Sequence, residues 1–371
     1  MAKSKRLRIE DIDPNFGGKS AKASLKWIDA FDRRLALRGF AWVAENRKKK
    51  NFRRLPDRKA KQFSEGVQLL SHHPTGGFLS FFTDSADVSV RMTVSDAAPM
   101  NHMPATGMAG AELFFRDGPT WIPAGTVIPH QTDTTFTSLL LENGPKIRRE
   151  YRLYLPLYKK LESLAIGLSP KALVRPAPSA AKPIFFYGTS ITQGGCANTP
   201  GSDFVSTVGR LLDTEVINFG FSGNGKGEPE IARLIREIDA EMFILDFQAN
   251  ADGDTLAAVL PEFIRLLREK HPSTPCVLMT NPGYDSRLTS AAARDLIDHK
   301  RDISMQVYLE KKAAGDPNIH FIDGYGLLPG GLSGAYVDGV HPTSHGFALM
   351  AERLAPQLRT IRLQEQFGSH C

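Results

Sequence analysis

Two short segments, far apart in the chain, contain the residue types that serine-dependent acyl transfer needs. Residues 338–343 are Asp-Gly-Val-His-Pro-Thr, and residues 188–192 are Gly-Thr-Ser-Ile-Thr. A serine hydroxyl is a weak nucleophile at neutral pH, so it needs an imidazole to accept its proton and a carboxylate to orient that imidazole. Asp338 precedes His341 by three residues, so it can fold back onto Nδ1 of the ring and leave Nε2 free for Ser190. The residue types and their spacing therefore predict a Ser-His-Asp triad.

The residues before Ser190 place it at the edge of a sheet. Residues 184–187 are an apolar, aromatic-rich run that stops at Gly188, which is typical of a buried parallel strand followed by a tight turn. Ligands of open α/β sheets bind at this carboxyl edge. As an alternative, Ser190 only caps the helix that follows. Considered together with Asp338 and His341, the catalytic interpretation is favoured.

The wider pattern resembles the SGNH (GDSL-type) hydrolase superfamily, in which separate blocks supply a Ser, a Gly, an Asn, and a His with its Asp. Residues 188–192 resemble the first block, although Gly-Thr-Ser replaces the usual Gly-Asp-Ser. Residues 218–223 (Asn-Phe-Gly-Phe-Ser-Gly) resemble the second block. Residues 246–252 stand where the family usually has Gly-x-Asn-Asp, and residues 338–341 match the Asp-x-x-His block.

This resemblance implies an oxyanion hole with three N–H donors. They are the backbone N–H groups of Ser190 and Gly223 and the side-chain amide of Asn250, with Gln248 as a poorer candidate for the amide. Acyl transfer places negative charge on the carbonyl oxygen, and loss of one such donor lowers the rate by roughly 10²–10³. Because Gly223 has no side chain, its backbone can approach a substrate closely. Its alternative role is a turn after a strand.

Two rival motifs overlap these segments, and neither fits. Residues 220–227 nearly match a phosphate-binding loop, but they lack the hydroxyl that would hold Mg²⁺, and residues 228–230 (Glu-Pro-Glu) place carboxylates where a phosphate would sit. His341 and His345 are spaced as in some zinc sites, but no Glu lies between them and Pro342 follows the first His. We therefore predict no cofactor and no metal, and we expect His345 to begin a helix.

The C-terminal half has the pattern of an α/β layer fold. Short apolar runs alternate with longer segments of helical periodicity, as in a parallel sheet with crossover helices. The runs are residues 184–187, 215–219, 242–247, 276–280 and 319–322. We predict a flavodoxin-like, three-layer SGNH hydrolase domain over residues 183–363, followed by a tail at 364–371. Its last helix, at about 344–358, is expected to pack behind the loop of Asp338 and His341.

The sequence pattern of the N-terminal half differs from that of the C-terminal half. Short alternating segments separated by turn residues, such as 77–82, 88–94 and 151–155, predict an antiparallel β-sandwich domain over residues 66–168. Residues 169–182 contain several Pro and Ala and are predicted to form a linker.

Two segments of the N-terminal half also resemble known proteins. Residues 107–121 and 153–158 are similar to segments of SGNH hydrolases that carry an N-terminal β-sandwich. That branch implies esterases or acyltransferases, often acting on acyl groups of carbohydrates or natural products. Glu112 and Phe114 depart from the branch pattern, so packing within the sandwich is the preferred role for this segment. His102 precedes it and is a candidate for the domain interface.

Positive charge is concentrated in a basic N-terminal segment, residues 1–65. The chain has a net charge of +6, yet residues 1–62 contain 19 Lys and Arg against 7 Asp and Glu. Residues 47–54 (Arg-Lys-Lys-Lys-Asn-Phe-Arg-Arg) suggest attraction to an anionic polymer. Such a run is more often a solvated surface, and no nucleic-acid-binding motif accompanies it. We therefore expect no nucleic-acid partner.

Length and composition fit two domains, since 371 residues exceed the size at which one core usually divides. No apolar stretch approaches the roughly 18 residues of a membrane-spanning helix, and no apolar segment of a secretory signal follows the basic start. Cys196, Cys276 and Cys371 are odd in number and lack metal-ligand spacing, as is typical of reduced thiols. We expect a cytoplasmic protein without a membrane partner.

Together these features predict a serine esterase that acts through Ser190, His341 and Asp338. The resemblance implies that its substrates are short-chain or acetyl esters of a small molecule or a glycan. Two alternatives remain open. The same triad can transfer the acyl group to an alcohol, or the chain can be a noncatalytic protein that binds carbohydrate or a polyanion and keeps the fold. The sequence does not specify the acyl length, the alcohol or the oligomeric state.

Overall fold

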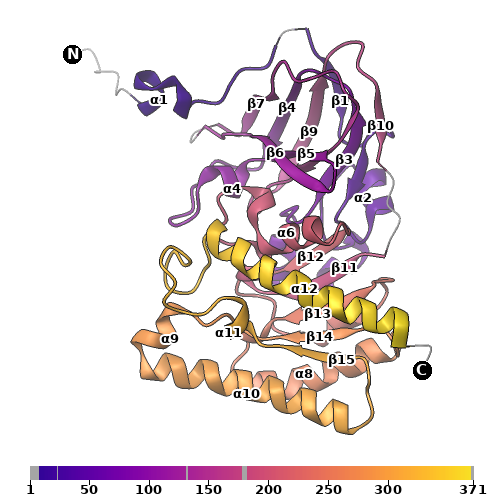
Figure 1. The fold of residues 1–371 in the computed structure, drawn as a ribbon, viewed down its shortest axis with the longest axis vertical. Coiled ribbons are helices and arrows are strands. Elements are labelled where there is room, and N and C mark those ends of the chain that lie inside the picture. The colour runs from indigo at the N-terminus through magenta and orange to yellow at the C-terminus, as the bar shows by residue number, and fades with distance from the viewer. Residues whose placement is uncertain (1–7, 23, 131–132, 178–181, 369–371) are drawn as a thin grey trace.

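A computed structural model describes residues 8–22, 24–130, 133–177 and 182–368. The chain forms an antiparallel β-sandwich and an α/β domain, drawn in the upper and lower parts of Figure 1. Two short N-terminal helices, α1 (Ile9–Ile12) and η1 (Pro14–Phe16), precede the first strand.

The α/β domain contains a five-stranded parallel sheet with the strand order β12-β11-β13-β14-β15. In chain order this is 2-1-3-4-5, the flavodoxin-like order, so the predicted fold class is confirmed. The strands coincide with the five apolar runs; they are β11 (Ile184–Gly188), β12 (Val216–Gly220), β13 (Met242–Asp246), β14 (Cys276–Met279) and β15 (Ile319–Ile322). Every residue of the first four of these strands is buried, because helices cover both faces of a parallel sheet.

Helices on the two faces form the outer layers. On one face α6 and α12 pack together, and their apolar residues share a core with Ile184 and Phe186 of β11. On the other face α7 and α8 pack on Phe185 and Tyr187, while α10 contacts α8 and β15. The alternation along β11 therefore divides one strand between two cores. The helices are α6 (Phe204–Leu211), α7 (Pro229–Ile235), α8 (Gly253–Arg268), α9 (Asp285–Thr289), α10 (Ala291–Ala313), α11 (Gly324–Leu327) and α12 (Ser344–Gly368).

The sandwich consists of two antiparallel sheets over one apolar core. The first sheet has the order β1 (Lys26–Asp29), β9 (Leu161–Leu168), β4 (Val88–Val94) and β7 (Thr135–Leu141). The second has the order β10 (Val174–Pro176), β3 (Phe78–Thr83), β8 (Arg149–Tyr154), β5 (Glu112–Asp117) and β6 (Thr120–Thr126), with β2 (Ala36–Arg38) also paired to β3. The predicted β-sandwich is confirmed.

The sheets extend beyond the predicted limits of residues 66–168. β1 and β2 come from the basic N-terminal segment, and β10 lies within the predicted linker, of which residues 178–181 lie outside the described part of the chain. These three strands are only three or four residues long, so they contain too little alternation to be recognised from the sequence.

The rest of the basic segment packs on the α/β domain. It contains α2 (Val43–Lys49) and η2 (Asp57–Gln62) and leads into α3 (Glu65–Leu70). Phe63 of this segment and Val67 of α3 join the core beneath β11. Much of its positive charge is paired within the molecule: Lys59 binds Glu237, and Arg53 binds Asp57 at 2.6 Å. The solvated-surface interpretation of this run is therefore incomplete, because several of its cations are structural.

Arg54 is the clearest example of a structural cation in this segment. Its side chain is 1 % exposed, and its guanidinium lies over the ring of Phe221 at 4.5 Å. It donates hydrogen bonds to four backbone carbonyl oxygens, those of Leu70, His73, Asn218 and Gly220. Burial lowers its pKa to about 9. Arg54 thus joins the N-terminal segment to the carboxyl end of β12.

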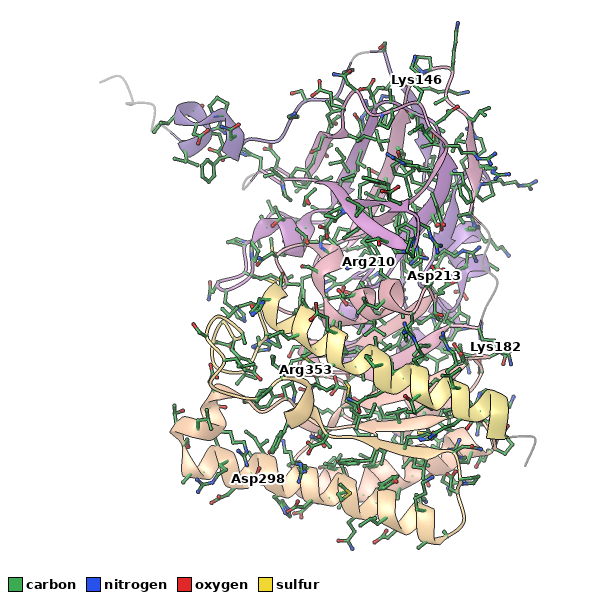
Figure 2. All side chains as sticks on the ribbon, viewed as in Figure 1. Lys146, Lys182, Arg210, Asp213, Asp298 and Arg353 are labelled. Atoms are coloured by element: carbon green, nitrogen blue, oxygen red, sulfur yellow. The ribbon has the colours of Figure 1, made fainter. Side chains whose placement is uncertain are left out.

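Charged side chains also join the sandwich to the α/β domain. Asp213, which follows α6, accepts two hydrogen bonds from Arg116 of β5, at 3.1 and 2.7 Å. Arg210 of α6 lies 4.2 Å from the ring centre of Phe114. Figure 2 shows Arg210 and Asp213 where the two domains meet. Glu112 accepts a hydrogen bond from the backbone of Gly201 at 3.0 Å, so the segment around Glu112 holds the domain interface as well as the sandwich.

The remaining sequence predictions concern the thiols and the membrane. Cys196 and Cys276 are buried and free, and Cys371 lies outside the described residues. Within the described ranges, no helix has both the length and the apolar character that crossing a membrane requires.

Candidate active site

Ser190 begins a short helix at the carboxyl end of the central strand. β11 ends at Gly188, Thr189 is the N-cap, and α5 spans Ser190–Gln193. A side chain at Gly188 would place Cβ 2.0 Å from Oγ1 of Thr192, so the turn needs glycine. Thr189 caps α5 by accepting a hydrogen bond from the backbone of Ile191. Ser190 itself is therefore not the cap, and its Oγ is free for another partner.

The structure brings Ser190, His341 and Asp338 together. Ser190 Oγ lies 2.9 Å from His341 Nε2, and His341 Nδ1 lies 2.8 Å from Asp338 Oδ2. The loop that carries the last two residues turns at Gly339, where φ is +83°. The three side chains thus form the hydrogen-bonded chain that their spacing predicted, across 151 residues of sequence.

Asp338 is held as a carboxylate. Burial acts to raise its pKa, but the backbone and ring N–H groups of His341 and the backbone N–H of Val340 outweigh it and lower the pKa to about 2. Both backbone bonds go to Oδ1, at 2.8 and 3.0 Å, which leaves Oδ2 for the ring. A carboxylate fixed in this way selects the tautomer with the proton on Nδ1, so Nε2 can accept a proton from Ser190.

The three predicted oxyanion donors line one pocket with His341. This pocket has a volume of about 540 Å³, and its lining includes Ser190, Gly223 and Asn250. Gly223 has a φ of +67°, a conformation that favours glycine. Among the described residues, the backbone N–H groups of Ser190 and Gly223 have no protein acceptor. Two donors are therefore available to an oxygen atom bound in the pocket.

The structure distinguishes the two amide candidates of the third block, Asn250 and Gln248, by whether they line the pocket. Asn250 lies in the turn η4 (Gln248–Asn250), lines the pocket, and donates to the carbonyl of Phe221 at 3.3 Å. Gln248 is 4 % exposed and accepts a hydrogen bond from Ser304 of α10. Asn250 is placed to act on a ligand, whereas Gln248 fixes the turn.

Two residues that sequence reasoning did not select hold the donors in place. Gln193 is buried on α5 and accepts a hydrogen bond from the backbone of Ser222, next to Gly223, at 2.9 Å. Lys300 of α10 is 8 % exposed and donates to the carbonyl of Ala249 at 3.1 Å. Lys300 also lines the pocket, and burial lowers its pKa. Neither residue belongs to a local motif, so only the fold identifies them.

Buried polar groups couple the three strand ends beneath Ser190. Asp246, at the end of β13, accepts a hydrogen bond from Thr192 Oγ1 at 2.7 Å, and burial raises the pKa of Asp246 to about 8. Asn218 of β12 donates to the carbonyl of Thr192 at 2.6 Å. The turn at Ser190 is thus held from both neighbouring strands.

The rival motifs are not supported by the geometry. The loop after β12 leads into α7, whose N-cap Glu228 accepts a hydrogen bond from Tyr187 at 2.6 Å, so a carboxylate occupies the start of that helix. His345 lies on the exposed first turn of α12, as expected for a residue that begins a helix.

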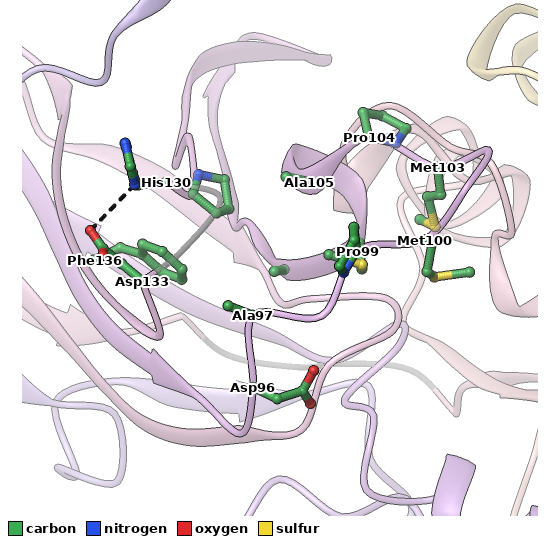
Figure 3. Close-up of a pocket in the computed structure, with 13 residues that line it drawn as sticks. Asp96, Ala97, Pro99, Met100, Met103, Pro104, Ala105, His130, Asp133 and Phe136 are labelled. Carbon is green, nitrogen blue, oxygen red and sulfur yellow. Dashed lines mark ion pairs between the residues drawn. The ribbon is translucent and has the colours of Figure 1, made fainter. Parts of the chain in front are cut away.

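A second cavity, of about 410 Å³, lies on the sandwich and contains no triad residue. Figure 3 shows its lining, in which Met100, Met103 and Pro104 face the pair of His130 and Asp133. This lining contains no serine, whereas Ser190 and His341 both line the pocket of about 540 Å³.

Comparisons with known proteins agree with this two-domain fold. Residues 181–359 match the GDSL-like lipase/acylhydrolase family, and residues 25–174 match the family described as the N-terminus of SGNH-hydrolase-type esterases. No curated protein sequence matches the chain.

Solved structures are similar over both domains. A protein from Bacteroides ovatus, described as a GDSL-like lipase, has 29% sequence identity and a TM-score of 0.84, covering 91% of this chain and 98% of that one. A salicylyl-acyltransferase from a tetracycline biosynthetic pathway has 20% identity and a TM-score of 0.73 over 92% of this chain and 98% of its own. A family two carbohydrate esterase from Clostridium thermocellum, in complex with cellohexaose, has 17% identity and a TM-score of 0.58 over 77% of this chain and 92% of its own.

Proposed function

Because this chain belongs to the SGNH (GDSL-type) hydrolases that carry an N-terminal β-sandwich, we propose that it is a serine esterase in which Ser190, His341 and Asp338 form the catalytic triad. The observation that carries the proposal is the hydrogen-bonded chain from Ser190 Oγ to His341 and Asp338, with distances of 2.9 and 2.8 Å, at the wall of a pocket. Its members come from two segments, the start of α5 and the loop before α12, and Ser190 and His341 are 151 residues apart in the sequence.

The geometry supports a two-step acyl-enzyme mechanism. Ser190 Oγ attacks the ester carbonyl while His341 Nε2 takes its proton, and the tetrahedral intermediate then expels the alcohol, which takes that proton from His341. A water molecule next gives a proton to His341 and attacks the acyl-enzyme, which releases the acid and restores Ser190. Asp338 keeps its charge throughout and stabilises the imidazolium that forms in each step.

The oxyanion of both intermediates would be held by Ser190 N–H, Gly223 N–H and the Asn250 amide. The first two N–H groups have no acceptor among the described residues, so they need no rearrangement before reaction. Asn250 has a long bond of 3.3 Å to Phe221, and its amide has a second hydrogen for a ligand. Donors that are oriented before the reaction stabilise the transition state without a reorganisation cost.

For the substrate, we propose a short acyl ester, such as acetyl, on a glycan or another hydroxyl-rich alcohol. The pocket combines amides and hydroxyls with apolar side chains; its lining includes Ser222, Asn281, Ser286, Leu296 and Ile297. A volume of about 540 Å³ lies within the range of small-molecule sites. The carbohydrate esterase among the structural relatives is consistent with a glycan, although at its level of identity it reports on the fold.

The first test is covalent labelling with a fluorophosphonate, followed by peptide mapping. Ser190 is expected to be labelled, and both Ser190→Ala and His341→Ala are expected to abolish labelling. Ser286→Ala is the matched control, because Ser286 lines the same pocket outside the triad, and this variant is expected to keep the label. A folded protein that is not labelled would contradict the proposal and favour a noncatalytic binding protein.

Product analysis then separates hydrolysis from transfer. Aryl acetates and acetylated oligosaccharides are incubated with and without an acceptor alcohol, and the products are identified by mass spectrometry. Free acid as the main product in the presence of the acceptor is the expected result. A transferred acyl group would instead assign the chain to the acyltransferase alternative with the same triad.

A further inference from the structure

A cluster of metal-binding side chains adjoins the triad. His102, Cys196 and His341 each place one ligand atom, a ring nitrogen or the sulfur, within 4.8 Å of the other two. His102 Nε2 also lies 3.9 Å from Asp338 Oδ2, and its ring meets that of His341 edge-on at 5.6 Å. The proposed mechanism uses neither His102 nor Cys196, so their proximity calls for a separate explanation.

The three residues come from three separate segments. His102 lies in the loop between β4 and α4 (Ala105–Ala109) of the sandwich, Cys196 follows α5, and His341 precedes α12. Cys196 has a φ of +73°, a conformation that is unfavourable for residues other than glycine. The turn imposes this conformation, because Gly195 N–H donates to Ser190 O at 2.8 Å and Ala197 N–H donates to Gly194 O at 3.1 Å. The Cys196 thiol is thus carried on a strained backbone beside the imidazole of His341.

We propose that His102, Cys196 and His341 bind Zn²⁺, with Asp338 or water in the fourth position, and that this binding switches the esterase off. Thiolate and imidazole are the ligands that Zn²⁺ prefers, and four-coordinate sites of this composition are tetrahedral. Zinc–ligand bonds of about 2.0–2.3 Å require the three groups to move inward. His102 has the freedom to do so, because its side chain is 40 % exposed.

Ligation of His341 through either ring nitrogen blocks catalysis. A metal on Nε2 takes the lone pair that would accept the proton of Ser190. A metal on Nδ1 displaces Asp338 and leaves the proton of the neutral ring on Nε2, so that atom no longer accepts. In both cases the Cys196 thiol releases its proton to solvent as the sulfur–zinc bond forms, no redox change occurs, and removal of the metal restores the triad.

The inhibitory part of this inference rests on the proposed function, whereas metal binding can be measured without it. Binding is followed with Co²⁺, which gives a thiolate-to-metal charge-transfer band in the near ultraviolet when sulfur is a ligand. The Ser190→Ala protein is used, so turnover does not enter the measurement. We expect the band in this protein and its loss when Cys196→Ser is added. Absence of the band would overturn the proposed site.

Inhibition is then measured by titrating ester hydrolysis with buffered Zn²⁺, with each variant compared to its own metal-free rate. Cys196→Ser and His102→Ala are each expected to weaken inhibition by at least about tenfold, since loss of even an outer-shell partner of a zinc site has such an effect. A chelator is expected to restore the rate. Equal inhibition of these variants and the wild type would show that His341 binds zinc alone and would refute the proposal.

His345→Ala is the matched control. His345 is the other histidine that the sequence pairs with His341, and it lies on the exposed first turn of α12. Its replacement is expected to leave both the Co²⁺ band and the zinc inhibition unchanged. Loss of either would move the site to the pair of His341 and His345 and contradict our assignment. An esterase assay that shows no hydrolysis in any variant would refute the proposed function alone, because the Co²⁺ band is independent of it.

Discussion

Replacement of Arg54 by methionine should destabilise the protein and slow catalysis, although Arg54 lies outside the pocket. Its guanidinium is the donor for four backbone carbonyl oxygens, at distances between 2.6 and 3.1 Å. Two of them, those of Asn218 and Gly220, belong to the end of β12, from which the chain continues to Gly223. Loss of Arg54 therefore removes a buried donor from these carbonyl oxygens, of which that of Leu70 keeps the N–H of His73, and it loosens the loop that carries the proposed oxyanion donor.

The size of the stability loss in Arg54→Met follows from the balance of two effects. A buried acceptor that loses its donor costs about 1–3 kcal/mol, and we take the lower end for four carbonyl oxygens that can find partial substitutes. The variant also no longer buries a charge, and this charge has no carboxylate partner among the described residues. Removing it stabilises the folded protein by about 1–2 kcal/mol. The net loss in the free energy of unfolding for Arg54→Met is then about 2–3 kcal/mol.

Urea unfolding followed by tryptophan fluorescence measures this loss. Trp42 lies 5.9 Å from the ring of Phe219 on β12, so it reports on the affected region. Lys48→Met is the control, because Lys48 lies in the same basic run but is exposed, and it should change stability by less than about 0.5 kcal/mol. Arg54→Lys keeps the charge but not the planar set of donors, so it should fall between the two.

Kinetics complete the test of Arg54. We expect Arg54→Met to lower kcat more than it raises KM, since the disturbed loop holds a donor that acts on the transition state. The reasoning would be refuted if Arg54→Met and Lys48→Met had the same unfolding midpoint in urea. It would also be refuted in part if stability fell while kcat stayed unchanged, because the link from Arg54 to Gly223 would then be absent.

Three further predictions follow from the site. Asn250→Ala should lower kcat by about 10²–10³ with little change in KM, which steady-state kinetics on an aryl acetate would measure; an unchanged kcat would remove Asn250 from the oxyanion hole. Asp338→Asn should lower kcat by about 10³–10⁴, because it reverses the tautomer of His341, and fluorophosphonate labelling should slow in parallel. Burial raises the pKa of Asp246 to about 8, from an ordinary value of 3.8. Between these two pH values the folded protein keeps a proton that the unfolded chain has lost. The free energy of unfolding should therefore fall between about pH 4 and pH 8. Asp246→Asn should remove that slope in urea unfolding measured across this range, and an unchanged slope would contradict the assignment.

The parts of the fold that could be predicted are those that local sequence determines. A strand buried on both faces must be a continuous apolar run, so residues 184–187 and their counterparts were recognisable. Asp338 and His341 are close in sequence, so a single loop conformation makes their contact. Ser190 could be placed because the strand before it fixes where the turn lies.

What could not be predicted depends on contacts between distant segments. Arg54 belongs to a run of cations, and nothing in the run distinguishes the one that is buried from its neighbours, because its partners include backbone carbonyls of β12. β1 and β10 are short edge strands whose pairing comes from β9 and β3. Lys300 reaches the carbonyl of Ala249 in η4 because α10 packs against that turn. In each case the determining information lies in tertiary packing.

Contacts between distant segments also join the sandwich to the α/β domain at the site. Gln193, which fixes the backbone beside Gly223, also donates to the carbonyl of Leu157 at 3.2 Å, and Leu157 lies in the segment between β8 and β9. Tyr158 of that segment donates to Ser190 O at 3.4 Å. The nucleophile turn and the oxyanion loop are therefore each held by a contact that originates in the sandwich. An isolated α/β domain would retain Ser190, His341, their hydrogen bond and Gln193, but it would lose the contacts of Leu157 and Tyr158. The N-terminal half therefore contributes to the site by holding Gln193 and the backbone of Ser190 in place.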